Sequence, residues 1–93
     1  MPEPILFYSK TDCSLCDKAW PDVASVARRH GLDLRKVDIE ADSSRESDLY
    51  YRHRFRIPVV EWRGVELAWG RIDRDELEAA LLEVASRGAD GRP

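Results

Sequence analysis

Two cysteines separated by two residues, Cys13 and Cys16, are the side chains of this sequence best suited to covalent chemistry. The thiolate is the reactive form of cysteine in disulfide exchange, and a neighbouring thiol can complete the exchange by forming a disulfide with it. The chain contains no further cysteine, whereas the framework of a small secreted disulfide-rich domain uses four or more. A disulfide between these positions closes almost no loop and would stabilise the fold little. The spacing therefore favours redox chemistry.

The surroundings of the pair give each cysteine a different expected role. An apolar run, Ile5–Tyr8, is followed by a short polar segment and the cysteines, and then by apolar residues at helical spacing. The start of a helix carries about half a positive charge and unpaired N–H groups, and both favour a thiolate. Cys13 would lie at this start, and Cys16 one turn inside, more buried and with a higher pKa. We therefore expect Cys13 to attack and Cys16 to resolve the mixed disulfide.

The charges near Cys13 act on its thiolate in opposite directions. Lowering a thiol pKa from about 8.5 to about 7 requires about 2 kcal/mol. A helix end supplies about 0.3–1 kcal/mol at exposed sites and up to about 2 kcal/mol where it is partly buried. Lys10 adds to this effect, whereas Asp12 and Asp17 oppose it, because nearby negative charge disfavours the thiolate. The sequence thus predicts a moderately lowered pKa for Cys13.

The same thiols have an alternative use in binding a metal or a partner. A closed structural zinc site needs four ligands, and the remaining candidates, His30 and His53, lie far apart in different predicted elements. We therefore predict no metal ligands within one chain. A zinc site shared between two chains and an iron–sulfur cluster stay open, so a non-enzymatic binding module is the alternative to an enzyme.

Length and composition exclude several classes of protein. Ninety-three residues with 43% apolar and 35% charged side chains suit one globular domain, expected over residues 1–87 with a frayed polar tail at 88–93. The net charge of −3 argues against nucleic-acid binding, which usually needs a concentrated basic surface. No apolar stretch approaches the roughly 20 residues of a membrane span, and none follows a basic start as in a signal peptide. We expect a cytoplasmic monomer.

Hydrophobic periodicity predicts seven elements in the order βαβαββα. The expected strands are Ile5–Tyr8, Leu34–Ile39, Ile57–Trp62 and Val65–Trp69, the last two joined as a hairpin by Arg63-Gly64. The expected helices run from Ser14 to about His30, within Ala41 to His53 with Asp42, Ser43 or Ser44 as cap, and from a capping box at Asp73 to about Ala85. This order predicts an α/β fold with a four-stranded mixed sheet flanked by three helices.

Three motifs in this order resemble the glutaredoxin-like family of the thioredoxin superfamily: Phe7 to Cys16, Arg56 to Val60 and Trp69 to Asp73. The similarity extends over roughly residues 4–86 and implies the thioredoxin/glutaredoxin fold. It also implies a cis Pro58 beside the cysteines, with the backbone of Ile57 pairing with a substrate. Lys10 would meet a carboxylate of glutathione.

The resemblance further implies a thiol–disulfide oxidoreductase that reduces protein disulfides or glutathione mixed disulfides. Such an enzyme holds no bound cofactor, and glutathione or a reductase supplies the electrons. Between the cysteines, however, Ser14-Leu15 replaces the Pro-Tyr of glutaredoxins. A single Gly70 stands where glutaredoxins have a double glycine, so Asp73 has two interpretations, as part of a glutathione site or as a helix cap.

Two further features have alternative interpretations. The basic run Arg52-His53-Arg54-Phe55-Arg56 leads into Pro58, where it either binds carboxylates of glutathione or of an acidic partner, or forms a solvated charged surface. Trp69, next to Gly70, is either a partner contact or a core residue.

Overall fold

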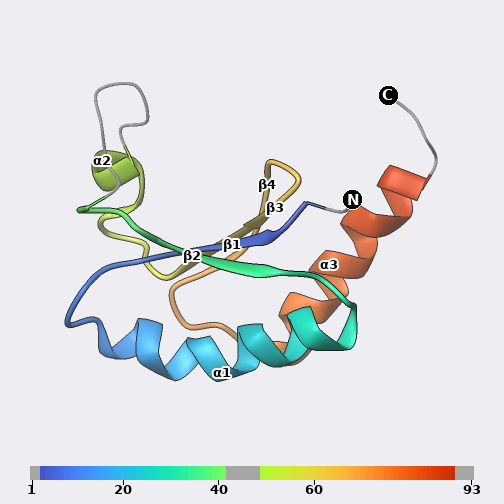
Figure 1. Ribbon diagram of the computed structural model, residues 1–93, viewed down its shortest axis with the longest axis horizontal. Coiled ribbons are helices and arrows are strands. Elements are labelled where there is room, and N and C mark those ends of the chain that lie inside the picture. Colours follow the sequence, from blue (N-terminus) through green and yellow to red (C-terminus); the bar gives the residue numbers. More distant parts are fainter. Residues whose placement is uncertain (1–2, 42–48, 90–93) are drawn as a thin grey trace.

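A four-stranded mixed sheet forms the centre of the computed structural model, which describes residues 3–41 and 49–89. Its strands are β1 (Ile5–Ser9), β2 (Leu34–Asp38), β3 (Val59–Trp62) and β4 (Val65–Trp69), in the spatial order β2-β1-β3-β4. Strand β1 pairs in parallel with β2 and antiparallel with β3, and β3 pairs antiparallel with β4. The predicted α/β architecture with a mixed sheet is confirmed (Figure 1).

Two long helices, α1 (Ser14–Arg29) and α3 (Arg74–Ala89), lie together on one side of the sheet (Figure 1). The prediction of three flanking helices needs correction, because α2 (Leu49–His53) has only five residues. Five residues make little more than one helical turn, which cannot cover a face of the sheet as α1 and α3 do. The caps predicted at positions 42–44 lie outside the described residues.

Helix α3 is longer than predicted. It continues to Ala89, so the first residues of the expected polar tail are helical. Alanine and arginine are strong helix formers, which favours continuation beyond Ala85. The rest of the tail, residues 90–93, lies outside the described part of the chain.

Strand β1 is buried on both faces, as its uninterrupted apolar run predicts. Ile5 and Phe7 contribute to the main core, which lies between the sheet and the two long helices. Tyr8 points to the other face, where it packs with Ile39 and Val59. Because both faces of β1 are fixed, the chain leaves the strand at a defined point and direction, and the cysteines follow there.

A tight hairpin brings the end of β4 beside the start of β3. Arg63 and Gly64 both have positive φ angles, 55° and 76°, as a two-residue type I′ turn requires. At the other end of β4, the N–H of Gly70 donates to the carbonyl oxygens of Pro58 at 2.7 Å and Arg56 at 3.0 Å. The loop after β4 is thus attached to the segment that leads into β3.

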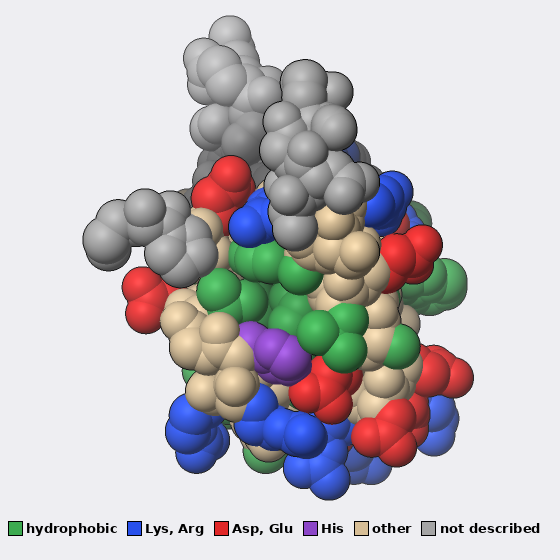
Figure 2. Space-filling model, turned by 90° about the vertical axis from the view of Figure 1, so that its right-hand side faces the viewer, with side chains coloured by type: hydrophobic (Ala, Val, Ile, Leu, Met, Phe, Trp, Pro, Cys, Tyr) green, Lys and Arg blue, Asp and Glu red, His purple; other side chains and the backbone are tan. Residues whose placement is uncertain are grey.

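Ion pairs join the end of α1 to the N-terminal half of α3. The Nε2 atom of His30, at the end of α1, lies 2.8 Å from a carboxylate oxygen of Glu78 in α3, and Arg29 lies 3.5 Å from the other oxygen. Figure 2 shows the side of the molecule on which these helices end, with acidic and basic side chains interspersed around apolar ones. Within residues 3–41 and 49–89, no helix combines the length and apolar character that crossing a membrane would need.

Asp73 caps the N-terminus of α3. Its Oδ2 atom accepts the N–H of Glu76 at 2.9 Å, and its carbonyl oxygen accepts the N–H of Leu77 at 2.9 Å. The first N–H groups of a helix have no partner within the helix, so a side-chain acceptor at this position stabilises the helix start.

Replacing the Asp73 cap with alanine should lower the free energy of unfolding by about 1 kcal/mol, because one N–H group at the start of α3 loses its acceptor. The matched variant Asp73→Asn keeps an acceptor oxygen at the cap, so its stability should stay close to the wild-type value. Urea unfolding followed by circular dichroism measures both differences. Equal stability of the alanine and wild-type proteins would contradict the capping role.

The short helix α2 is held to the sheet by His53. The ring of His53 stacks on Tyr8, with 4.6 Å between the ring centroids, and the residue is only 5% exposed. Neither ring nitrogen has a hydrogen-bond partner in the structure described for 3–41 and 49–89. Burial, with the nearby Arg52 guanidinium, lowers the pKa of His53. The carbonyl oxygen of His53 accepts the N–H groups of Arg56 and Ile57, so α2 fixes the approach to β3.

The variant His53→Phe should remove a pH-dependent component of stability. Because the folded protein lowers the pKa of His53 below its ordinary value of 6.5, the unfolded chain binds a proton first as the pH falls through 6.5. The free energy of unfolding of the wild type therefore decreases below pH 6.5, and above it both states hold a neutral ring. Urea unfolding at about pH 8 and about pH 5.5 measures this loss, which should be smaller in the variant. An equal loss in both proteins would contradict the prediction.

Candidate active site

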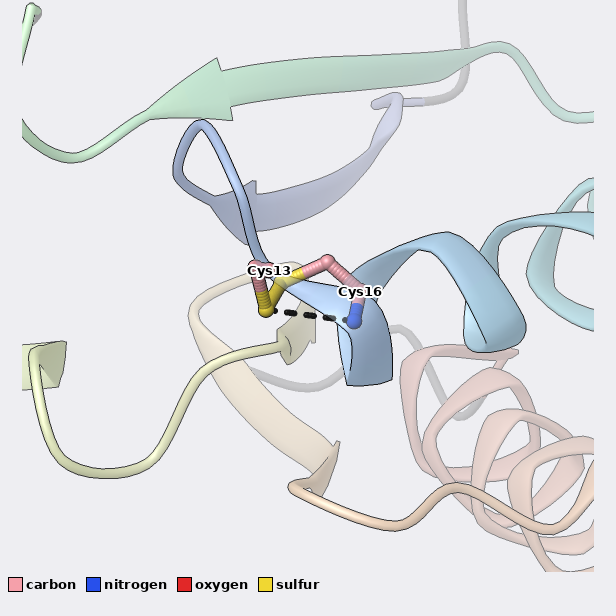
Figure 3. Close-up of a disulfide and its surroundings, with 2 residues drawn as sticks. All are labelled: Cys13 and Cys16. Carbon is pink, nitrogen blue, oxygen red and sulfur yellow. Dashed lines mark hydrogen bonds between the residues drawn. A yellow bond between two sulfur atoms is a disulfide. The ribbon is translucent and has the colours of Figure 1, made fainter.

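Cys13 and Cys16 form a disulfide at the start of α1 (Figure 3). Their Cα atoms lie 5.2 Å apart, within the range that a disulfide requires. Cys13 is the N-cap residue of the helix and has extended backbone angles, φ −117° and ψ 102°. Its Sγ atom accepts the N–H of Cys16 at 3.2 Å, in the position usually taken by the oxygen of a capping side chain. The Cys13 sulfur therefore caps the helix and is also the sulfur that we expect to react.

The two sulfurs differ in their access to solvent. Cys16 is 3% exposed and belongs to the main core with residues of the sheet and both long helices. Cys13 is half-buried at the edge of that core. A reagent therefore reaches Cys13 first, and Leu15 between the cysteines is 38% exposed beside it.

The charged residues expected to influence Cys13 lie around the loop between β1 and α1. Lys10, Asp12 and Asp17 are exposed, and they line one groove of about 290 Å³ together with Lys36 and Asp38. Asp12 has a positive φ of 58° in the turn that directly precedes Cys13. The N–H of Asp17 donates to the carbonyl oxygen of Cys13 at 3.1 Å, which holds Asp17 in the first turn of the helix. Charges of both signs thus surround the helix start.

The Ile57–Pro58 peptide is cis, as the resemblance implied. Pro58 is fully buried, while Ile57 is half-buried and packs against the same core cluster as Cys13. Figure 3 shows the chain that leads into β3 passing beside the disulfide. The N–H of Ile57, however, donates to the carbonyl oxygen of His53 at 3.1 Å. One of the two backbone groups expected to pair with a substrate is therefore already used within the protein.

Gly70 lies on the same groove as the cysteine loop. This groove, of about 170 Å³, runs between the first turns of α1 and the loop after β4, and its lining includes Leu15, Lys18, Gly70 and Arg71. Asp73 lies outside it and lines a neighbouring groove of about 260 Å³ with Trp69 and Arg71. The structure thus places Gly70 on a groove with Leu15, the residue between the cysteines, and it places Asp73 one groove away at the start of α3.

Two exposed aromatic side chains add to the predicted site. Phe55 is 83% exposed and Trp69 is 54% exposed. Of the two interpretations of Trp69, the structure excludes the core residue. The sequence reasoning did not single out Phe55 itself, although its position between two arginines directly before Ile57-Pro58 is a signal for an exposed apolar residue near the site.

The histidines considered as metal ligands are not grouped with the cysteines. His30 bonds to Glu78 at the end of α1, and His53 stacks on Tyr8. In the described part of the chain, no three His, Cys, Asp or Glu side chains come together as they would around a metal ion.

Solved structures share the thioredoxin fold with this chain at low sequence identity. Thioredoxin 1 from the thermophilic eubacterium Thermosipho africanus matches with a TM-score of 0.66 and 16% identity, over 92% of this chain and 98% of its own. Protein Ne2328 from Nitrosomonas europaea gives 0.67 and 20%, over 85% and 91%. A malarial protein gives 0.59 and 16%, over 85% and 92%.

No curated protein matches the sequence. Residues 4–82 match a family described as Glutaredoxin-like domain (DUF836), and this range contains the cysteine pair, Ile57-Pro58 and Gly70 to Asp73. With its thioredoxin fold and its disulfide at the start of the first helix, the chain belongs to the glutaredoxin-like domain family.

Proposed function

We propose that this protein is a thiol–disulfide oxidoreductase that uses Cys13 and Cys16 as a dithiol pair. The observation that supports it most is the placement of the disulfide, with the half-buried Cys13 at the helix cap and Cys16 buried beneath it. A staple for stability would gain almost nothing from so short a loop. A reversible disulfide at an accessible helix start is the arrangement that exchange chemistry requires.

The reaction begins with the reduced protein. The Cys13 thiolate attacks one sulfur of a substrate disulfide, a bond forms between the two sulfurs, and the second substrate sulfur leaves as a thiolate that takes up a proton. Cys16 then loses its proton and attacks the Cys13 sulfur. The Cys13–Cys16 disulfide forms, the bond to the substrate breaks, and the remaining substrate sulfur leaves as a thiol. Two electrons have passed from the protein to the substrate.

The helix start contributes to the first step through one hydrogen bond. The Cys16 N–H reaches Cys13 Sγ in the disulfide, and we expect it to bond to the Cys13 thiolate when the pair is reduced. A hydrogen bond to a charged group contributes about 1.5–3 kcal/mol. Since one pKa unit corresponds to about 1.36 kcal/mol, this bond offsets the repulsion from Asp12 and Asp17. A larger fraction of Cys13 is then present as the thiolate, the form that attacks the substrate.

The substrates that we propose are protein disulfides and glutathione mixed disulfides. They would enter beside Ile57 and Pro58 and extend along the groove at Gly70, with Lys10 and Asp73 at its margins. Two equivalents of glutathione, or a reductase, return the oxidised pair to the dithiol. The cycle needs no metal or organic cofactor, and we propose that it runs in the cytoplasm, where other thiols are kept reduced.

Two single substitutions separate the roles of the cysteines. Cys13→Ser should abolish the reduction of hydroxyethyl disulfide, because the attacking sulfur is absent. Cys16→Ser should retain the attack and accumulate a mixed disulfide on Cys13, since the resolving thiol is missing. Mass spectrometry of the tryptic peptides identifies the modified position. Turnover by Cys13→Ser would contradict the assignment, and so would a mixed disulfide that accumulates on Cys16 of Cys13→Ser while none forms on Cys13 of Cys16→Ser.

A metal assay on the purified protein addresses the alternative use of the thiols. One zinc ion or one iron–sulfur cluster per two chains, together with the absence of disulfide turnover, would overturn the oxidoreductase in favour of a binding module.

The substitution Asp17→Asn should make Cys13 more acidic. Removing the negative charge from the first turn of α1 favours the thiolate, so the pKa of Cys13 should fall by roughly half a unit. The pH dependence of iodoacetamide alkylation, measured in the Cys16→Ser background, reports this pKa. Asp33→Asn, which removes the same charge at the start of β2, is the matched control. An equal shift in both variants would mean that only the total charge of the protein matters.

A further inference from the structure

Arginine and aromatic side chains lie on the two chain segments that directly precede Ile57 and Gly70 of the proposed site. Arg54, Phe55 and Arg56 precede Ile57, and Trp69 ends β4; we call these four residues the arginine–aromatic rim. Phe55 and Trp69 are the most exposed large apolar side chains in the described structure, at 83% and 54%. Exposed apolar surface beside a groove is a common sign of an interaction site.

Arg56 of the rim directly precedes Ile57, which packs against the same core cluster as Cys13. The Gly70 N–H bonds to the carbonyl oxygens of Arg56 and Pro58, so the two chain segments that carry the rim are joined directly. Gly70 also lines the groove that contains Leu15, the residue between the cysteines. A molecule whose sulfur reaches Cys13 along this groove would therefore have the rim at its side.

The rim holds its cations in fixed positions. The guanidinium of Arg54 lies 4.5 Å from the centroid of the Phe55 ring, and that of Arg56 lies 4.7 Å from the centroid of the Trp69 ring. Arg56 Nη2 also forms a 2.7 Å ion pair with a carboxylate oxygen of Glu66. Stacking on a ring and ion pairing restrict the arginine side chains before a partner binds. The entropy cost of ordering them on binding is therefore smaller. A guanidinium has five N–H donors, so Arg56 can bond to a second carboxylate while it keeps Glu66.

We infer that the rim binds an acidic segment of a partner protein, whose disulfide is the substrate of Cys13. Residues 52–56 carry three arginines and no acidic side chain in a protein whose net charge is −3, and Glu66 is already paired with Arg56. The acidic residues Asp73 and Glu76 line the groove beside Trp69, at the start of α3. On the face seen in Figure 2, by contrast, both signs are interspersed. This charge separation favours a partner with carboxylates and orients it during encounter.

The aromatic rings favour a protein segment over a small anion. Phe55 and Trp69 flank the arginines, and covering their exposed faces needs apolar side chains next to the carboxylates. Glutathione has carboxylates but few apolar atoms for this purpose.

The inference rests on the proposed reductase function, and the experiment separates the two. Three synthetic peptides would carry the same internal disulfide and the same leucine residues, flanked by glutamate, glutamine or lysine. The pre-reduced protein would be mixed with each peptide, and separately with hydroxyethyl disulfide, at low ionic strength. We expect the glutamate peptide to be reduced about tenfold faster than the glutamine peptide, and the lysine peptide to be the slowest. In about 0.5 M salt the differences should largely vanish.

Matched double variants locate the effect. Arg54→Gln/Arg56→Gln should bring the ratio of the glutamate to the glutamine rate close to one. Arg28→Gln/Arg35→Gln removes the same charge from exposed positions on α1 and β2 and should keep the tenfold ratio. If the ratio of the two rates fell to one in both double variants, the preference would depend on the total charge of the protein, and the role of the rim would be overturned. The variant Phe55→Ser should slow all three peptides, because the apolar contact is common to them.

The remaining outcomes distinguish the two proposals. Reduction of hydroxyethyl disulfide with equal rates for the three peptides would overturn the rim and keep the oxidoreductase. No reduction of any disulfide would overturn the oxidoreductase, and the substrate inference with it. Binding of the wild type, but not of Arg54→Gln/Arg56→Gln, to phosphatidylserine vesicles in place of the peptides would assign the rim to a lipid surface and contradict the inference.

Discussion

The site depends on one junction, the point at which a doubly buried strand is followed by the start of a helix. Strand β1 is fixed on both faces, so Cys13 follows at a position that the core determines. The buried Cys16 anchors the first turn of α1 from beneath, and its N–H reaches the Cys13 sulfur above. The packing that stabilises the fold is therefore also the packing that aims the helix dipole at the reactive atom.

A second set of hydrogen bonds assembles the other wall of the site. Gly70 joins the loop after β4 to the residues before β3, and the carbonyl oxygen of His53 fixes Arg56 and Ile57 from the opposite direction. No single element forms this wall; it is made from three segments that the hairpin and α2 bring together. A substitution in α2, remote from the sulfur atoms along the chain, can consequently alter the geometry of the substrate groove.

The parts of the structure that follow from local pattern could be predicted from the sequence. The apolar run of β1, the helix after Cys13, the Arg63-Gly64 turn and the Asp73 cap each depend on neighbouring residues, and all are present. Predictions that depended on tertiary packing were less successful. The continuation of α3 and the exposure of Trp69 are decided by how much apolar surface distant segments offer, which periodicity does not report. The cis peptide between Ile57 and Pro58 was predicted only from the resemblance to a known family, because no local sequence pattern indicates it.

The hydrogen bond from the Ile57 N–H to His53 has a consequence for selectivity. A main-chain donor at this position would hold any extended peptide, whatever its sequence, because every residue offers the same carbonyl group. Because the Ile57 N–H already donates to His53, it does not offer a bound peptide this sequence-independent hydrogen bond. For the proposed reductase, discrimination between substrates would then depend on the side chains at the groove's edge, and the range of disulfides accepted would become narrower as their contribution grows.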